Sequence, residues 1–158
     1  MLFRSVWQTV ARDGQIFGDA ARQSRVHLTN GLWFSYPGYN ELLSGAADPR
    51  IDSNDKVPNP NVTVLEWLNT RPGVAGRVEA FGAWDVLPSI VNTARSGIPV
   101  GTAFTPAPKA STARERELNQ MARDLPAVWS YGSFDAPFVE AALEAMRARD
   151  PQIGRAHV

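Results

Sequence analysis

The sequence lacks cysteine altogether and has only two histidines among its 158 residues. Disulfide bonds, a cysteine nucleophile and thiolate zinc sites are therefore excluded. The 16 basic and 16 acidic residues leave a formal net charge of zero, so no excess of one sign favours nucleic acid or an anionic membrane surface. No apolar run approaches the roughly 20 residues that cross a bilayer. We therefore expect no nucleic-acid partner and no membrane segment.

What the chain does contain is enough for one domain with a hydrophobic core, since 44% of its residues are hydrophobic and 20% are charged. Helical patterns cover residues 2–13, 38–44, 63–68, 85–93, 112–123 and 135–149. In the last of these, one face carries Phe138, Ala142, Leu143 and Met146. Short apolar–polar alternations predict strands at residues 15–19, 25–29 and 76–82.

Strands that alternate with helices indicate an α/β fold with a mostly parallel sheet. Three visible strands are few for so many helices, so the layer looks incomplete. Residues 46–61 form a long loop rich in Asp, Asn and Pro, and loops of this length in a compact domain are often functional. Residues 97–111 are rich in proline and predict an exposed excursion.

Ser35 lies between the strand predicted at residues 25–29 and the helix predicted at residues 38–44. In open α/β sheets, sites gather where strands end and helices begin, and unpaired N–H groups at a helix start suit an anionic substrate. Such a serine needs a base or a metal ion to activate it, and no histidine is near it in sequence. Local physics leaves a plain alternative open, in which Ser35 is a helix N-cap or turn residue.

Several long blocks resemble the alkaline-phosphatase-like superfamily, in its bacterial phosphoglyceromutase-like or sulfatase-like branch. The blocks read WQTVARDGQIFGD, VHLTNGLWFSYPGYNELLSGAADPRIDSND, PNPNVTVLEWLN, GRVEAFGAWDVLPSIVNTARSGIPV and LNQMARDLPAVWSYGSFDAPFVEAALEAMR. They keep this order and span Trp7 to Met146. The resemblance implies a three-layer α/β/α fold, of which residues 1–152 would form an incomplete catalytic domain.

In related nucleotide pyrophosphatase/phosphodiesterases, a Thr-Phe-Pro-Asn-His stretch carries the nucleophile. Aligned without gaps, that Thr falls on Ser35 and the Pro on Pro37, while Gly38 and Tyr39 replace Asn-His. The resemblance therefore implies that Ser35 is the catalytic nucleophile. It also implies a substrate-binding asparagine on the following loop, where Asn54 is our candidate. The alternative for Asn54 is an Asx-turn residue that organises a proline-rich loop.

The superfamily uses two divalent metal ions, and zinc is the metal expected here. The oxygen of Ser35 would be a shared ligand, and the resemblance implies that the other ligands come from segments outside this chain. We therefore expect an N-proximal fragment that is inactive by itself. Residues 153–158, IGRAHV, match a reading frame of a common sequencing adapter and fit neither helix nor apolar strand, so we expect a non-native tail. His157 would then be no ligand.

The remaining candidate ligands have simpler interpretations. His27 lies in a strand pattern and is expected to be a structural histidine, and Asp85 is expected to cap a helix. The function implied is hydrolysis of a small phosphate or sulfate ester through a seryl nucleophile, in a protein that is periplasmic or secreted when intact. The alternative is a non-catalytic binding or structural protein with the same fold.

Overall fold

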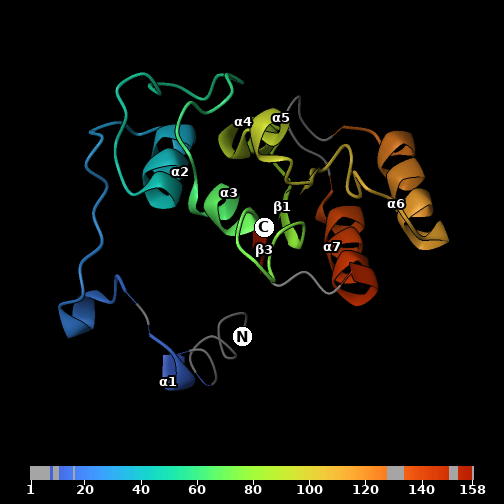
Figure 1. The fold of residues 1–158 in the computed structure, drawn as a ribbon, viewed down its shortest axis with the longest axis horizontal. Helices are drawn as coiled ribbons and strands as arrows, with labels where there is room; N and C mark the ends of the chain where they lie inside the picture. Colours follow the sequence, from blue (N-terminus) through green and yellow to red (C-terminus); the bar gives the residue numbers. More distant parts are fainter. Residues whose placement is uncertain (1–7, 9–10, 16, 128–133, 150–152, 158) are drawn as a thin grey trace.

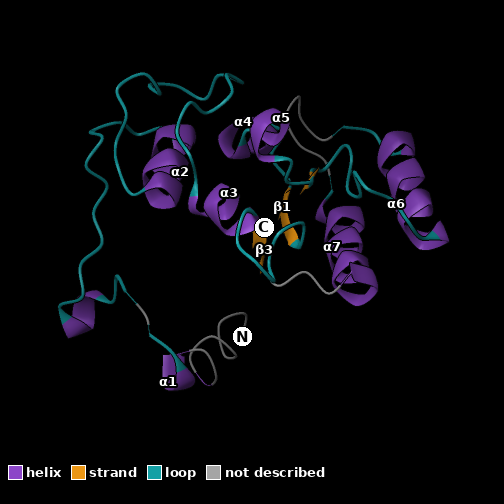
Figure 2. Cartoon of the chain, viewed as in Figure 1, coloured by secondary structure: helices purple, strands orange, loops and turns teal. Residues whose placement is uncertain are grey.

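A three-stranded parallel sheet lies at the centre of the computed structural model, which describes residues 8, 11–15, 17–127, 134–149 and 153–157. Strand β1 (Val78–Gly82) is the middle strand, flanked by β2 (Val100–Gly101) and β3 (Ile153–His157). All of β1 is buried. Helices surround this sheet (Figure 2). The mixed helix and parallel strand content confirms a small α/β fold.

The helices account for most of the regular structure (Figure 1). In chain order they are α1 (Ala11–Asp13), the 3-10 helix η2 (Ala20–Arg22), α2 (Ser35–Ser44), α3 (Val64–Asn69), α4 (Leu87–Val91), α5 (Thr93–Ser96), α6 (Ala113–Asp124) and α7 (Asp135–Arg149). The helices predicted to start at Thr63 and Thr112 have these residues as N-caps, because their hydroxyls accept hydrogen bonds from Glu66 N and Glu115 N.

Strand β1 divides the core because successive side chains point to opposite faces of a sheet. Val78 and Ala80 pack with buried residues of α2, α3 and α4. Phe81 packs on the other side with Phe138 and its neighbours on α7. Within α7 the buried positions include Ala141 and Ala145, while Met146 is half-exposed. The expected apolar face is thus rotated, because small residues let α7 approach the sheet.

The last strand corrects one expectation. Residues 153–157 pair with β1 in parallel, from Val78 opposite Ile153 to Gly82 opposite His157. The interpretation that this segment fits no strand is therefore wrong, since parallel pairing depends on backbone groups rather than on an apolar side-chain pattern. That residues 153–158 are foreign to the natural protein stays a prediction.

Two expected strands near the start of the chain are also wrong. Residues 17–19 and 25–29 form no strand, and Val26 and Leu28 are 62% and 56% exposed. His27 lies exposed on this irregular segment, so it is not the structural strand histidine we expected. Of the helix expected at residues 2–13, only Ala11–Asp13 is observed as α1, and residues 1–7, 9 and 10 lie outside the described residues. Alternation alone does not make a strand without a partner to pair with.

The proline-rich excursion at residues 97–111 is not simply exposed. It contains β2, and Ala103 and Ala107 are 2% and 1% exposed. The side chain of Asn119 on α6 fixes it by binding both backbone groups of Ala107, at 2.9 Å and 2.7 Å. The prolines shape a segment that packs against α6 rather than one that extends into solvent.

Candidate functional site

The first residue of α2 is Ser35, and its side chain is exposed. The N-cap residue is Phe34, which is extended and provides no side-chain hydrogen bond. Ser35 is therefore not the helix cap that the plain alternative proposed. Helix α2 begins three residues before the expected start because Pro37 falls in the first turn, where a helix has no intrahelical partner for its N–H groups. It ends as expected, with Gly45 in the left-handed region at φ 81°.

Asn54 supplies the cap that Phe34 lacks. Its side-chain Oδ1 accepts a hydrogen bond of 2.9 Å from the backbone N–H of Tyr36. The two site residues implied by the resemblance thus lie at the same helix start, although they are far apart in sequence. The bond joins residues 18 positions apart, so Asn54 is not a local Asx-turn residue. Among the described residues, its Nδ2 group has no hydrogen-bond partner.

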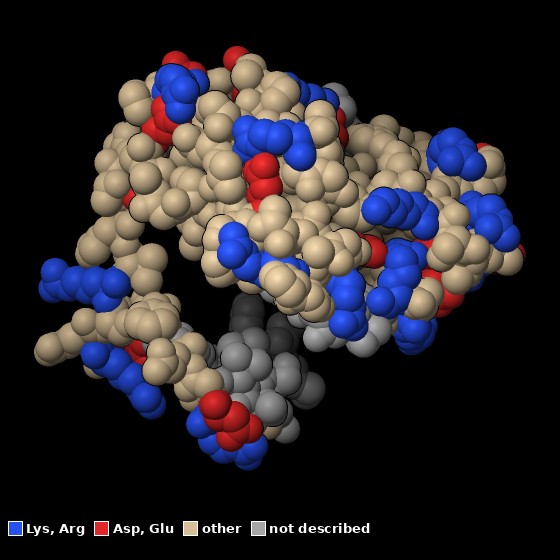
Figure 3. All heavy atoms as spheres, in the orientation of Figure 1, with Lys and Arg blue, Asp and Glu red and all other residues tan. Residues whose placement is uncertain are grey.

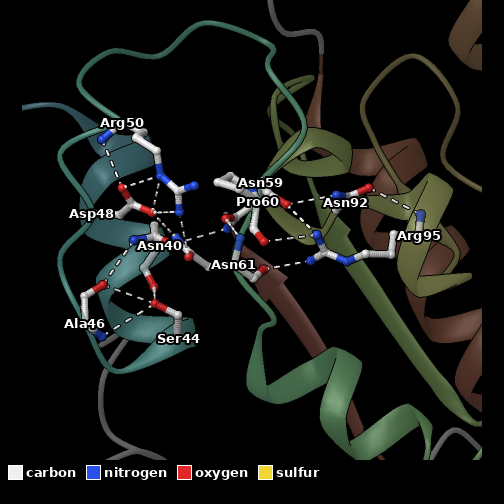
Figure 4. Close-up of polar contacts among 10 residues, drawn as sticks. All are labelled: Asn40, Ser44, Ala46, Asp48, Arg50, Asn59, Pro60, Asn61, Asn92 and Arg95. Atoms are coloured by element: carbon white, nitrogen blue, oxygen red, sulfur yellow. Dashed lines mark hydrogen bonds and ion pairs between the residues drawn. The ribbon is translucent and has the colours of Figure 1, made fainter.

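A buried amide network holds the loop that carries Asn54 (Figure 4). Asn40 on α2 and Asn59 on the loop are both fully buried, and Asn59 Nδ2 donates to Asn40 Oδ1 at 3.3 Å. Asn61 Nδ2 donates to the same oxygen at 3.1 Å and to Asp48 Oδ2 at 2.7 Å. Asp48 also pairs with Arg50, which holds the pKa of the Asp48 carboxyl well below its usual value. Both ends of the loop are thereby tied to α2.

The same network extends to α4 and α5 on the other side of the loop. Asn92, in the left-handed region at φ 49°, donates to Asn59 O at 2.8 Å. Arg95 donates to the backbone oxygens of Asn59 and Asn61 at 2.9 Å and 2.7 Å, and it pairs with Glu66 on α3. Buried polar groups need such partners. These asparagines were not predicted as functional from the sequence, although it contains PNPN and the isolated Asn40 and Asn92.

The segment that leads into Ser35 is fixed by Glu41 on α2. Its carboxylate accepts hydrogen bonds from the backbone and side chain of Thr29 at 2.6 Å and 2.7 Å, and from those of Asn30 at 3.1 Å and 2.7 Å. The hydrogen bonds from Thr29, followed by those from Asn30, lower the pKa of Glu41. Leu28 lies over Gly38, where an added Cβ would be 3.3 Å from its Cδ1 atom. Gly38 thus accommodates the chain's own leucine.

The loop after β1 contributes a further charged pair beside α2. Asp85 is not the N-cap of α4, which is Val86. It instead forms an ion pair with Lys56, two residues after Asn54. Asp85 Oδ1 is buried and has no hydrogen-bond partner in the described part of the chain. Next to it, the rings of Trp84 and Tyr39 lie 6.4 Å apart. The interpretation of Asp85 as a helix cap is therefore wrong.

The described residues do not form a metal centre. No group of three or more His, Asp or Glu side chains among them could hold an ion. The exposed His27 lies on the segment before α2, and His157 lies in β3. The two divalent ions implied by the resemblance are thus not matched by the donor set present here, and we derive no chemical step through them.

Neither the surface charge nor the lengths of the helices indicate a particular function. Basic and acidic side chains both occur on the face shown in Figure 3, with several basic groups near α6 and α7. Each helix in the described ranges is too short or too polar to traverse a lipid bilayer.

Comparison with family models, with curated proteins and with solved structures finds no match to this chain. The geometry around Ser35 and Asn54 is therefore the basis for any functional conclusion.

Proposed function

We propose that this chain carries the nucleophile of a hydrolase that cleaves small phosphate or sulfate esters, within an alkaline-phosphatase-like fold. The observation that supports it most is the meeting of Ser35 and Asn54 at the start of α2, where Asn54 Oδ1 accepts a hydrogen bond from Tyr36 N. The resemblance assigns these two residues to one site. Their proximity depends on a loop that the resemblance alone does not position.

The surroundings of the serine suit an anionic, tetrahedral group. The exposed Ser35 hydroxyl is at the positive end of a ten-residue helix. The Nδ2 group of Asn54 is available to donate to an oxygen that gains negative charge in the transition state. The buried amide network fixes the loop, and such preorganisation lowers the cost of placing the donor.

The chemistry proposed is a double displacement. Ser35 Oγ forms a bond to phosphorus or sulfur while the bond to the leaving alcohol oxygen breaks, and the hydroxyl proton passes to a base. Water then cleaves the seryl ester and restores the hydroxyl. In this proposal Ser35 Oγ would be a shared ligand of the two divalent ions, and their other ligands would come from parts of the intact protein other than residues 1–158. The proposal also includes export to the periplasm or secretion.

The test uses the protein encoded by the complete gene. Wild type, Ser35→Ala and Ser44→Ala are compared on p-nitrophenyl phosphate, bis(p-nitrophenyl) phosphate and p-nitrophenyl sulfate. Ser44 is a matched control because it lies at the other end of α2, where its hydroxyl bonds Asn40 O at 2.8 Å. We expect Ser35→Ala to lose more than about 10³-fold in kcat with stability changed by less than about 0.5 kcal/mol. If the Ser35→Ala variant still turns over these esters, the assignment of Ser35 as the nucleophile is wrong.

A second candidate is a non-catalytic binding or structural protein. The observation that favours it is the cap itself, because Asn54 Oδ1 already serves the backbone of α2. In that case the complete protein would turn over none of the three esters, and Asn54 substitutions would change stability only. Measuring bound divalent metal in the complete protein separates the two candidates, since only the hydrolase requires it.

A further inference from the structure

Asp85 is the only side chain in the described ranges with a buried nitrogen or oxygen atom that has no hydrogen-bond partner, and that atom is its Oδ1. Its other oxygen accepts a hydrogen bond from Lys56 Nζ, and the side chain is only 16% exposed. A buried carboxylate oxygen without a donor is costly, and such groups in native structures need an explanation. The helix that follows provides none, because the N-cap of α4 is Val86. The carboxylate therefore serves the ammonium group of Lys56 rather than the helix.

Lys56 and Asn54 are turned toward the same part of the molecule. Neither lines the pocket of about 240 Å³ beside their loop. The lining of that pocket includes the residues that alternate with them, which are Ser53, Asp55 and Val57. Asn54 contacts Tyr36 N at the start of α2, and Lys56 contacts Asp85. Their side chains therefore leave the loop on the side away from the pocket.

The partner of Lys56 is also close to α2. Trp84, which precedes Asp85, has its ring 6.4 Å from that of Tyr39. Tyr39 follows Ser35 by four residues in α2, and side chains with this spacing share one face of a helix. The ion pair, which joins residues 29 positions apart, is thus held beside the face of α2 that begins with Ser35.

Lys56 keeps donors for a ligand. An ammonium group has three N–H donors, and in the part of the chain that the structure describes Lys56 uses one of them, on Asp85. The Lys56 side chain is 58% exposed. Arg50 on the same loop is engaged more fully, because its guanidinium forms a bidentate pair with Asp48. Lys56 can therefore add a charged donor to the amide donor of Asn54.

We propose that Lys56 selects phosphate monoesters as the substrates of the hydrolase, an inference that rests on the proposed function. While Asn54 Nδ2 donates to one non-bridging oxygen of the phosphoryl group that Ser35 attacks, Lys56 donates to another. Charge-assisted hydrogen bonds of this kind are the stronger ones. A monoester presents a charged oxygen at the position where a diester carries its second ester group, so the ammonium group gains this partner only with the monoester. Asp85 is a positioning residue, because it holds the ammonium group beside the serine.

The test measures kcat/KM of the protein encoded by the complete gene on p-nitrophenyl phosphate and on bis(p-nitrophenyl) phosphate. We expect wild type to prefer the monoester, and Lys56→Met to lower the ratio of monoester to diester kcat/KM by at least about tenfold. Lys56→Arg keeps the positive charge and should retain most of this ratio. Asp85→Asn keeps the cation but not its position, so the ratio should fall by about threefold. Lys109→Met, at an exposed position after β2, is the matched control and should behave as wild type.

The outcomes separate this inference from the function on which it rests. If wild type hydrolyses neither these esters nor p-nitrophenyl sulfate, the proposed function is wrong and the inference falls with it. If wild type hydrolyses the sulfate ester alone or prefers the diester, or if Lys56→Met has the wild-type ratio, only the inference is wrong. Urea unfolding shows whether each variant is folded. A purely structural role of the ion pair would leave the ratio unchanged, because partial unfolding lowers the turnover of both esters equally.

Discussion

At the scale of single residues, the proposed function gives the oxygen and the nitrogen of the Asn54 amide different roles. Its Oδ1 caps the helix that begins at Ser35, through the hydrogen bond from Tyr36 N. Its Nδ2 is the donor that the proposed reaction requires. A stability measurement and a kinetic measurement therefore address different atoms of the same side chain.

Asn54→Ala and Asn54→Asp separate these two contributions. Asn54→Ala removes the acceptor, so we expect the free energy of unfolding to fall by about 1 kcal/mol. Asn54→Asp keeps an oxygen for Tyr36 N and places a negative charge at the helix start, so its stability should equal or exceed that of wild type. Urea unfolding of the 158-residue chain measures both variants.

The kinetic half of the comparison needs the complete protein. Because Asn54→Asp replaces the Nδ2 donor by an oxygen, it should lower kcat by about 10²-fold although its helix cap is intact. If Asn54→Asp is fully active, and the activity of the two variants changes only as their stability does, Asn54 acts only as a helix cap.

The sequence suggested Ser35 and Asn54 as candidate site residues, but it did not predict the asparagines that hold the loop of Asn54. A motif can be matched by residue type and spacing, whereas Asn40, Asn59 and Asn61 act through bonds between the helix and the loop. An asparagine looks the same in sequence whether it is an exposed turn residue or a buried donor. Only the folded chain shows that Asn40 and Asn59 are fully buried.

At the scale of helices and strands, local signals succeeded where the element controls its own ends. The helix starts predicted at Thr63 and Thr112 and the helix end predicted at Gly45 are boundaries that the structure reproduces, with both threonines as N-caps and Gly45 left-handed. Strands were harder, because a strand exists only with its partner. The alternation at residues 25–29 has no partner, whereas Val100–Gly101 pairs with β1 although its sequence is too short to predict.

Gly101 explains how β2 fits between β1 and the turn that follows it. A Cβ added at this position would lie 2.4 Å from Pro106 O and 2.6 Å from Phe81 Cδ1. Because a backbone oxygen cannot move aside as a flexible side chain can, we expect Gly101→Ala to lower the free energy of unfolding by about 3 kcal/mol. Thermal or urea unfolding of the 158-residue chain measures this loss.

Gly45→Ala is the matched control for that substitution. An added Cβ there meets nothing within 4 Å, but φ is 81°, so the cost is conformational and amounts to about 1 kcal/mol. A Gly101→Ala variant that is no less stable than Gly45→Ala would show that β2 and residue 106 can separate without penalty.

At the scale of the whole molecule, one arginine connects the sheet to the two C-terminal helices. Arg149 at the end of α7 pairs with Glu79 on β1 at 2.7 Å and with Glu115 on α6. Glu79 and Glu115 are 5% and 0% exposed. Since both carboxylates are buried, each depends on the guanidinium for its charge balance. The ion pairs of this triad therefore join β1 to α7, as the apolar contact between Phe81 and Phe138 also does.

Removing the cation should therefore destabilise the fold strongly. We expect Arg149→Met to lower the free energy of unfolding by roughly 3–5 kcal/mol, because two carboxylates stay buried without their partner. Arg147→Met, in the same helical turn, is the control. Arg147 is largely exposed, and its ion pair with Glu144 is long, at 4.0 Å. Similar urea midpoints for the two variants would show that the triad contributes no more than a surface ion pair.

The same triad predicts how stability depends on pH. Burial alone raises the pKa of Glu115, but hydrogen bonds from the Ser111 and Thr112 amides and from Arg149 outweigh it and lower the pKa to about 2, from 4.5. A carboxyl with a lower pKa in the folded state stabilises the fold fully above its unfolded pKa, and this contribution is lost as the pH falls toward the folded pKa. Glu115→Gln should thus be less stable than wild type at pH 7, and the difference should shrink between about pH 4.5 and pH 2. Urea unfolding across this pH range measures the difference in the free energy of unfolding. The control is Glu117→Gln at an exposed position, whose stability should change with pH in the same way as that of wild type. A Glu115→Gln deficit that stays constant down to pH 2 would mean that its carboxylate charge does not hold α6 to α7.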